Sequence, residues 1–93
     1  MSMDKVTRRM EIVNEKGLHA RAAAKLVEVV EGFDARADVS CNGQLASGDS
    51  IMGLLMLAAA KGSTIDVEIA GPDAAPLAEA VAALVADRFG EDM

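Results

Sequence analysis

Aromatic residues and cysteine are scarce in this sequence. Its 93 residues include no tryptophan, no tyrosine and two phenylalanines. A base-stacking platform or an aromatic-lined pocket depends on such rings, so the composition argues against both. Cys41 is the single cysteine, which excludes an intrachain disulfide and leaves too few thiolates for a structural zinc site.

Positive charge is also in short supply. The chain has 9 lysines and arginines against 15 aspartates and glutamates, so its formal net charge is −6. Such a surface repels a phosphate backbone, and no nucleic-acid partner is expected. The charge is nevertheless uneven, because residues 1–25 carry six basic and three acidic side chains while the remainder carries three and twelve. A phosphate or an acidic partner is therefore expected to bind the first quarter.

Long apolar runs are absent as well. The longest nearly uncharged run, residues 51–60, has about half of the ~20 residues that a membrane-spanning helix needs. The first residues lead directly into a charged segment, without the apolar core of a signal peptide. We therefore expect a cytoplasmic protein without membrane insertion, and the length predicts a single domain over residues 1–93.

The hydrophobic pattern predicts four strands and three helices. Strands are expected at 6–13, 36–41, 44–47 and 64–70, and helices at 19–32, at 51–57 and in a last segment that ends at Gly90. Asn42-Gly43 is the strongest hairpin signal, and Ser50 suits a helix N-cap. The order β-α-β-β-α-β-α favours an α+β fold, a two-layer sandwich with the helices on one side of the sheet.

The segment 51–57 is too uniformly apolar to form one buried stripe. Its predicted core residues are Ile51, Leu54 and Leu57. Met52 and Leu55 are expected to be exposed beside His19, where a flexible methionine suits several partners in turn. The alternative, in which all of these side chains are buried, stays open in so small a domain. The acidic C-terminal region is interpreted as a solvated face.

His19 is the residue most suited to chemistry. It follows a turn at 14–17 and stands where a helix begins, so the first backbone N–H groups lack partners and the helix dipole places roughly half a positive charge there. This field disfavours the imidazolium and leaves a neutral ring with a nucleophilic lone pair. A phosphate attached to that ring would face the free N–H groups. Arg21 can bind the same oxygens, while Lys16 and Lys25 add looser positive charge.

The spacing alone also allows a simpler interpretation. A lone histidine beside a turn is more often a capping or surface residue than a catalytic one. A general-base enzyme is disfavoured, because no carboxylate or nucleophile accompanies His19 in the local sequence.

Two segments resemble the signatures of one protein family. Residues 17–23, which read Gly-Leu-His-Ala-Arg-Ala-Ala, resemble the active-site motif of the HPr family, the histidine-containing phosphocarriers of the phosphoenolpyruvate-dependent phosphotransferase system. Residues 50–57, followed by Ala60-Lys61-Gly62, resemble its second signature. The motifs occur in the expected order and separation, and the resemblance covers essentially the whole chain. It implies an antiparallel four-stranded sheet covered on one side by three helices, in a single HPr-like domain.

The resemblance also implies a function. His19 would receive a phosphoryl group from Enzyme I and pass it to a histidine of an Enzyme IIA protein, with Arg21 stabilising the group in both transfers. The chain would then be a stoichiometric carrier and not an enzyme, a monomer without metal or organic cofactor. The expected partner-binding residues are Lys16, Ala20, Lys25, Met52 and Leu55. A non-catalytic regulatory binding module that uses the same surface is the alternative.

The sequence departs from the family pattern at two places. Ala22 stands where most members have proline, and Asp49 precedes Ser50 where many have a basic residue. Ser50 is either a simple N-cap or the target of a regulatory serine kinase and phosphorylase, a modification that Asp49 would weaken. The run 54–57 looks closer to the nitrogen-related carriers than to the sugar-uptake type, and both branches stay open.

Overall fold

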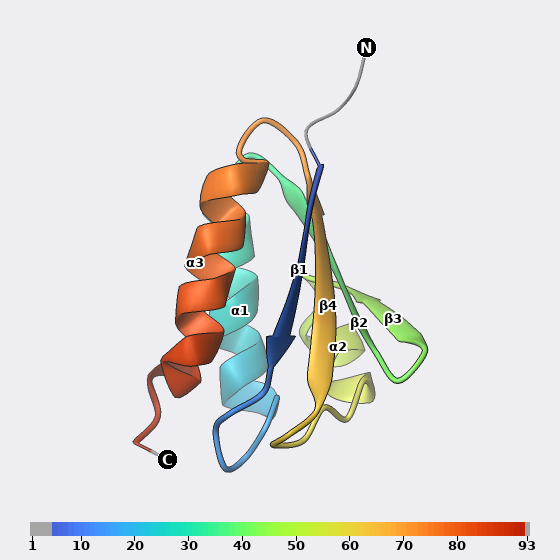
Figure 1. Ribbon diagram of the computed structural model, residues 1–93, viewed down its shortest axis with the longest axis vertical. Helices are drawn as coiled ribbons and strands as arrows, with labels where there is room; N and C mark the ends of the chain where they lie inside the picture. The colour runs from blue at the N-terminus through green and yellow to red at the C-terminus, as the bar shows by residue number, and fades with distance from the viewer. Residues whose placement is uncertain (1–4, 93) are drawn as a thin grey trace.

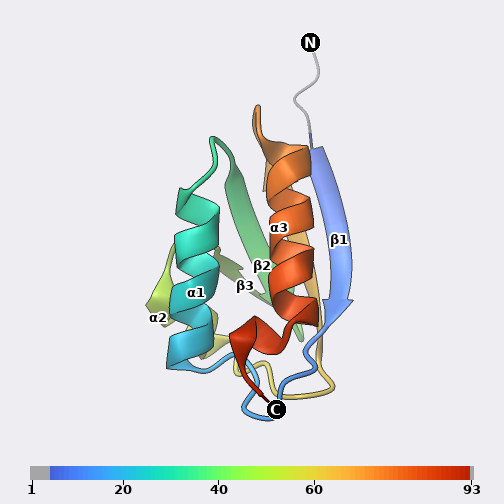
Figure 2. The same ribbon diagram turned by 90° about the vertical axis from the view of Figure 1, so that its left-hand side faces the viewer.

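The computed structural model describes residues 5–92, which form a helical layer packed on one face of a sheet (Figures 1 and 2). The elements in chain order are β1 (Lys5–Glu11), α1 (Ala20–Glu31), β2 (Arg36–Cys41), β3 (Gln44–Ser47), α2 (Ile51–Met56), β4 (Thr64–Ala70) and α3 (Ala74–Ala86). This order confirms the predicted β-α-β-β-α-β-α arrangement and the α+β open-faced sandwich.

All pairings in the sheet are antiparallel, in the strand order β1-β4-β2-β3. The register sets Val67 of β4 between Arg8 of β1 and Val39 of β2. Because side chains alternate along a strand, this register aims the apolar residues of β2 and β4 at the helices. On the other face, cross-strand ion pairs such as Lys5–Glu68, at 3.1 Å, meet solvent.

The core lies between the sheet and the two long helices. Figure 1 shows α1 and α3 on the same side of the sheet, and Figure 2 shows them side by side. The apolar positions of α1 recur at helical spacing and face inward, as do those of α3. The largest fully buried side chains of this core include Leu26, Ile65, Val67, Ile69, Leu77, Val81, Val85 and Phe89.

The hairpin between β2 and β3 follows directly from its two turn residues. Asn42 has φ 53° and Gly43 has φ 82°, so both lie in the left-handed region that a type I′ turn requires. The two strands therefore begin and end where the sequence predicted them.

The prediction for segment 51–57 was correct for three side chains and wrong for two. Leu54 and Leu57 are buried and Met52 is 71% exposed, as predicted. Leu55, predicted to be exposed, is half-buried. Ile51, predicted in the core, is 40% exposed. The reason is that α2 is a six-residue helix at the margin of the helical layer, packed on α1 and β3, so its first turn has little to pack against.

The end of the chain also differs from the prediction. The last helix ends at Ala86, before Gly90, and a left-handed turn follows, with φ 56° at Arg88, 54° at Phe89 and 79° at Gly90. Left-handed backbone costs about 1–2 kcal/mol per non-glycine residue, and fully burying a phenylalanine contributes about 1.5–3 kcal/mol. Phe89 is completely buried, which offsets part of the cost of the two non-glycine residues, Arg88 and Phe89.

This C-terminal turn (Arg88–Gly90) leads the chain back to the beginning of α1, as Figure 2 shows. The ammonium of Lys25 on α1 donates to the carbonyl of Phe89 at 2.7 Å and fastens the two segments together. The acidic C-terminal region is therefore not simply a solvated face, because Glu91 points inward. No helix within residues 5–92 is long and apolar enough to span a bilayer.

Candidate functional site

The site is built around the first turn of α1, where His19 is the N-cap residue. Its backbone is extended, with φ −87° and ψ −176°, and its carbonyl accepts the first helical hydrogen bond from Ala23 N at 2.8 Å. Its ring Nδ1 accepts from the backbone N–H of Arg21 at 3.3 Å. One of the unpartnered N–H groups of the helix end thus points at Nδ1.

The turn before His19 owes its shape to Gly17. This residue has φ +67°, and a Cβ there would lie 2.6 Å from the carbonyl oxygen of Ala59. The next residue, Leu18, is buried and donates to that same carbonyl at 2.9 Å. The close approach requires glycine and fixes the direction in which His19 leaves the turn.

The other ring nitrogen of His19 faces the C-terminal segment. Nε2 is hydrogen-bonded to the Oε2 atom of Glu91. The second carboxylate oxygen accepts from Asn14 Nδ2 at 2.9 Å, and the same amide nitrogen donates to the carbonyl of Gly17 at 2.8 Å. Because Asn14 is completely buried, these contacts join the turn, the histidine and the C-terminal segment into one network.

The charge of Glu91 follows from these contacts. Hydrogen bonds from Asn14 and His19 lower the pKa of the Glu91 carboxyl below its ordinary value of 4.5, and the positive charge of Lys16 adds to the effect. Partial burial opposes the shift without cancelling it. An anion therefore stands beside Nε2 at neutral pH.

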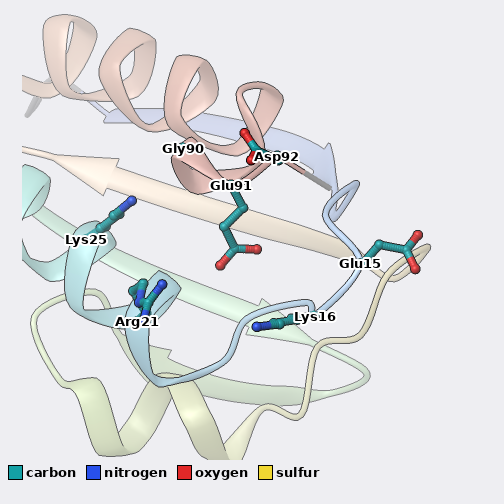
Figure 3. A pocket seen from close by; sticks show the side chains of 7 residues that line it. All are labelled: Glu15, Lys16, Arg21, Lys25, Gly90, Glu91 and Asp92. Carbon is teal, nitrogen blue, oxygen red and sulfur yellow. The ribbon is translucent and has the colours of Figure 1, made fainter.

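A cavity of about 330 Å³ lies next to this network (Figure 3). Its lining residues are Glu15, Lys16, Arg21, Lys25, Gly90, Glu91 and Asp92. Figure 3 shows the Glu91 side chain reaching from the C-terminal segment toward the side on which Arg21 and Lys16 lie. Three basic side chains, Lys16, Arg21 and Lys25, line this space together with three acidic ones, Glu15, Glu91 and Asp92. The basic groups are the ones that can bind a small anion there.

The structure brings together most of the residues predicted for the site. Lys16, Arg21 and Lys25 line the cavity, and Ala20 is exposed in the first turn of α1. Lys25 is more firmly held than a loose counter-charge, through its bond to Phe89. Met52 and Leu55 lie on α2, which packs beside α1.

Ser50 occupies a separate position at the beginning of α2. Its Oγ accepts from the backbone N–H of Gly53 at 3.0 Å, which is the N-cap contact predicted for it. The neighbouring Asp49 carboxylate accepts from Ser47 Oγ at 2.6 Å. Ser50 itself is half-buried.

Two residues of the site were missed by the sequence analysis. Asn14 was predicted only as part of a turn, and Glu91 only as part of an acidic, solvated region. Asparagine in a tight turn is a weak signal for a buried amide, and nothing in the sequence near Glu91 indicates a contact with a residue 72 positions away. Within residues 5–92, no group of three or more His, Cys, Asp or Glu side chains is arranged to hold a metal ion.

Comparison with known proteins gives a consistent result. The family model described as "PTS HPr component phosphorylation site" matches residues 6–87. The phosphocarrier protein HPr of Cupriavidus necator is 48% identical over 80 residues, which cover 86% of this chain and 90% of that protein. The phosphocarrier protein NPr of Escherichia coli K12 is 43% identical over 88 residues, 94% of this chain and 98% of its own.

A solved structure shares the architecture. The crystal structure of a phosphocarrier protein HPr from Bacillus anthracis aligns with a TM-score of 0.83 and 36% identity, covering 87% of this chain and 96% of that one.

Proposed function

The chain belongs to the HPr family of phosphocarrier proteins, and we propose that Nδ1 of His19 accepts a phosphoryl group from Enzyme I and passes it to a histidine of an Enzyme IIA protein. The observation that carries this proposal is the position of Nδ1 at the N-terminus of α1, where it faces the backbone N–H of Arg21, a residue whose side chain lines the cavity together with Lys16 and Lys25. In this role the protein is a stoichiometric carrier that acts in the cytoplasm as a monomer.

The geometry at Nδ1 supports reversible transfer. The hydrogen bond from the Arg21 N–H to Nδ1 is long, at 3.3 Å. Little free energy is therefore lost when that bond breaks and the Nδ1 lone pair attacks phosphorus. The phosphoryl oxygens then accept hydrogen bonds from the backbone N–H groups at the helix end. The Arg21 guanidinium can bind the same oxygens, and it stabilises the charge that spreads over them during transfer.

The proposed docking surface lies around this site. Ala20 is exposed at the beginning of α1, and Met52 presents a flexible apolar side chain from the neighbouring α2. Leu55 is half-buried on the same helix, and Lys16 and Lys25 supply positive charge near the beginning of α1. A surface that combines exposed apolar and basic side chains suits partners that carry a phosphorylated histidine.

Ser50 is the position at which we propose regulation by a serine kinase and phosphorylase. A phosphate there would add about −1.5 to −2 charge close to the exposed Met52 and repel an acidic partner. Asp49 already contributes one negative charge beside this position, so the contrast between the two states is smaller than with a basic neighbour.

The relay is tested by intact-mass measurement after incubation with phosphoenolpyruvate, Mg²⁺ and Enzyme I. We expect one added phosphoryl group that is removed by acid, as a phosphorus–nitrogen bond should be, and none in His19→Ala. Ser50→Ala is the matched control and should take up the group normally. Equal uptake by His19→Ala would refute the proposal.

The acceptor decides between the two branches of the family. Relatives named HPr and NPr match this chain at similar identity, so the proposal covers the relay and the branch needs its own experiment. Transfer from the phosphorylated protein to a sugar-type or a nitrogen-type Enzyme IIA protein separates them. If the folded protein took up no phosphoryl group, the exposed α2 surface would favour a non-catalytic binding module instead.

A further inference from the structure

The two nitrogens of the His19 ring meet opposite partners. Nδ1 faces the backbone N–H of Arg21, a donor, whereas Nε2 faces the carboxylate of Glu91, an acceptor. A neutral imidazole carries one proton, so one nitrogen donates and the other accepts. A proton on Nε2 satisfies both contacts. The other tautomer would set one N–H against another and a lone pair against an anion.

Glu91 is held firmly in this position. Its side chain is only 15% exposed, and its second oxygen is taken by the amide of Asn14. Both amide hydrogens of Asn14 are used, because the other one goes to the Gly17 carbonyl. Turning that amide over would place its oxygen against two acceptors, so its orientation is fixed even though Oδ1 has no hydrogen-bond partner among the described residues.

The backbone that carries Glu91 is equally well anchored. Phe89, two residues earlier, is completely buried, and its carbonyl accepts from Lys25 at 2.7 Å. The C-terminal turn therefore delivers the carboxylate from a fixed point to one edge of the ring.

We infer that Glu91 is a positioning residue for the proposed phosphoryl transfer, which holds the ring proton on Nε2 and thereby presents the Nδ1 lone pair to the phosphoryl group. This inference rests on the proposed function. It adds a carboxylate from the end of the chain to a site whose other parts lie near the beginning of α1.

The same carboxylate supports the ring during the reaction. When Nδ1 attacks, its lone pair forms the new nitrogen–phosphorus bond, and the bond from phosphorus to the donor breaks with its electron pair going to the donor nitrogen. The proton stays on Nε2, so the ring becomes cationic beside the Glu91 anion. In the second transfer the nitrogen–phosphorus pair returns to Nδ1 as the acceptor attacks, and the ring is neutral again.

Glu91 also balances the electrostatics of the helix end. The positive end of the α1 dipole disfavours a cationic ring while it attracts the phosphoryl oxygens. A carboxylate on the opposite edge of the ring favours the cation without competing for the space at Nδ1. The two fields thus act on different atoms of the same intermediate.

The test compares Glu91→Gln with Asp92→Asn. Both substitutions remove one negative charge from the cavity lining, but Asp92 is exposed and has no hydrogen bond to His19. Glutamine has a single oxygen, so it can accept from Asn14 or from His19 and not from both. The ¹⁵N resonances of the His19 ring report directly which nitrogen carries the proton.

We expect the wild-type protein and Asp92→Asn to carry the proton on Nε2, and Glu91→Gln to show a mixture of the two tautomers. The maximal rate of phosphoryl uptake from Enzyme I should fall by about tenfold in Glu91→Gln, the scale expected for one charge-assisted hydrogen bond, with little change in KM. Glu91→Asp, which keeps the carboxylate on a shorter side chain, should restore part of both properties.

An unchanged proton position and rate in Glu91→Gln would overturn this inference alone. An equal loss in Asp92→Asn would overturn it as well, because a general effect of charge would then explain the result. Absence of uptake by the wild-type protein would instead refute the proposed function, while the ring resonances of the unphosphorylated protein would still test the role of Glu91.

Discussion

The two nitrogens of the His19 ring contact two different parts of the chain, one close to His19 in sequence and one far from it. On the Nδ1 side, the ring and the N–H group that it faces both come from residues 17–21, through a glycine turn and the beginning of a helix. On the Nε2 side, the carboxylate of Glu91 arrives from 72 positions away, on a left-handed turn anchored by Phe89. Local backbone geometry supplies the nucleophile and the anion site, whereas tertiary packing supplies the group that orients the ring.

Phe89→Ala removes the side chain that anchors the C-terminal turn on the Nε2 side of the ring, and we expect it to give the largest loss of stability. Loss of a completely buried phenylalanine is expected to lower the free energy of unfolding by about 3 kcal/mol, measured by urea denaturation. The ring resonances should shift as in Glu91→Gln, because the backbone that carries Glu91 is no longer anchored. Leu45→Ala, at a position 72% exposed, is the control and should change stability by less than about 0.5 kcal/mol.

Gly17→Ala disrupts the turn that leads into His19 on the Nδ1 side of the ring. The substitution puts a side chain at φ +67° and a Cβ 2.6 Å from a backbone carbonyl, so we expect a loss of about 2–3 kcal/mol in unfolding free energy, more than the ~1–2 kcal/mol of the dihedral alone. Gly43→Ala is a matched control, since Gly43 has φ +82° and a methyl group added there would meet no atom within 4 Å, so that only the dihedral cost applies. Equal losses in the two variants would contradict the close approach at Gly17.

Arg21→Ala, on the Nδ1 side of the ring, should lower the rate of phosphoryl transfer without lowering the stability of the fold. Removing one group that stabilises developing charge typically slows a reaction by about 10²-fold or more, so uptake from Enzyme I should fall by roughly hundredfold. Because Arg21 is exposed, the unfolding free energy should change by less than about 0.5 kcal/mol. Arg36→Ala, on β2, removes the same charge elsewhere, and a similar fall in that variant would point to the net charge of the protein instead.

The smallest effect is the pH dependence of the contact made by Glu91. Its folded-state pKa lies below the ordinary value of 4.5, so the contact stabilises the protein above that pH and the contribution is lost as the pH falls through the lowered pKa. The stability difference between wild type and Glu91→Gln should therefore be largest near neutral pH and shrink on acidification below the ordinary pKa of 4.5. Urea denaturation at pH 7, 5 and 3 checks this, with Asp92→Asn as the control. A difference that grows toward low pH would contradict the assigned sign.

Most of the fold could be predicted because its signals are local. The alternating strand 64–70 and the Asn42-Gly43 turn each depend on neighbouring residues, and the structure has both at the predicted positions. The error at Ile51 arose from a non-local cause, since burial in a short helix depends on which other elements cover it.

The candidate site divides in the same way. His19 and Arg21 belong to a motif of consecutive residues, and the cap contact between them follows from the beginning of a helix. Glu91 could not be predicted, because two residues without glycine's freedom, Arg88 and Phe89, adopt positive φ only where burial of the phenylalanine offsets the strain. Sequence patterns do not indicate where burial of a side chain offsets strain in the backbone.

The strand order β1-β4-β2-β3 has a consequence for how the protein reaches its folded state. β1 and β2 do not touch as neighbours in the sheet; each pairs with β4, which is synthesised after both. Until residues 64–70 have emerged, the nascent chain can form a hairpin and single helices but no continuous sheet. Folding is therefore expected to be cooperative and to be completed only after β4 has been made, because both β1 and β2 pair with it. A partly made chain carries the histidine motif but not the scaffold that gives its ring a direction.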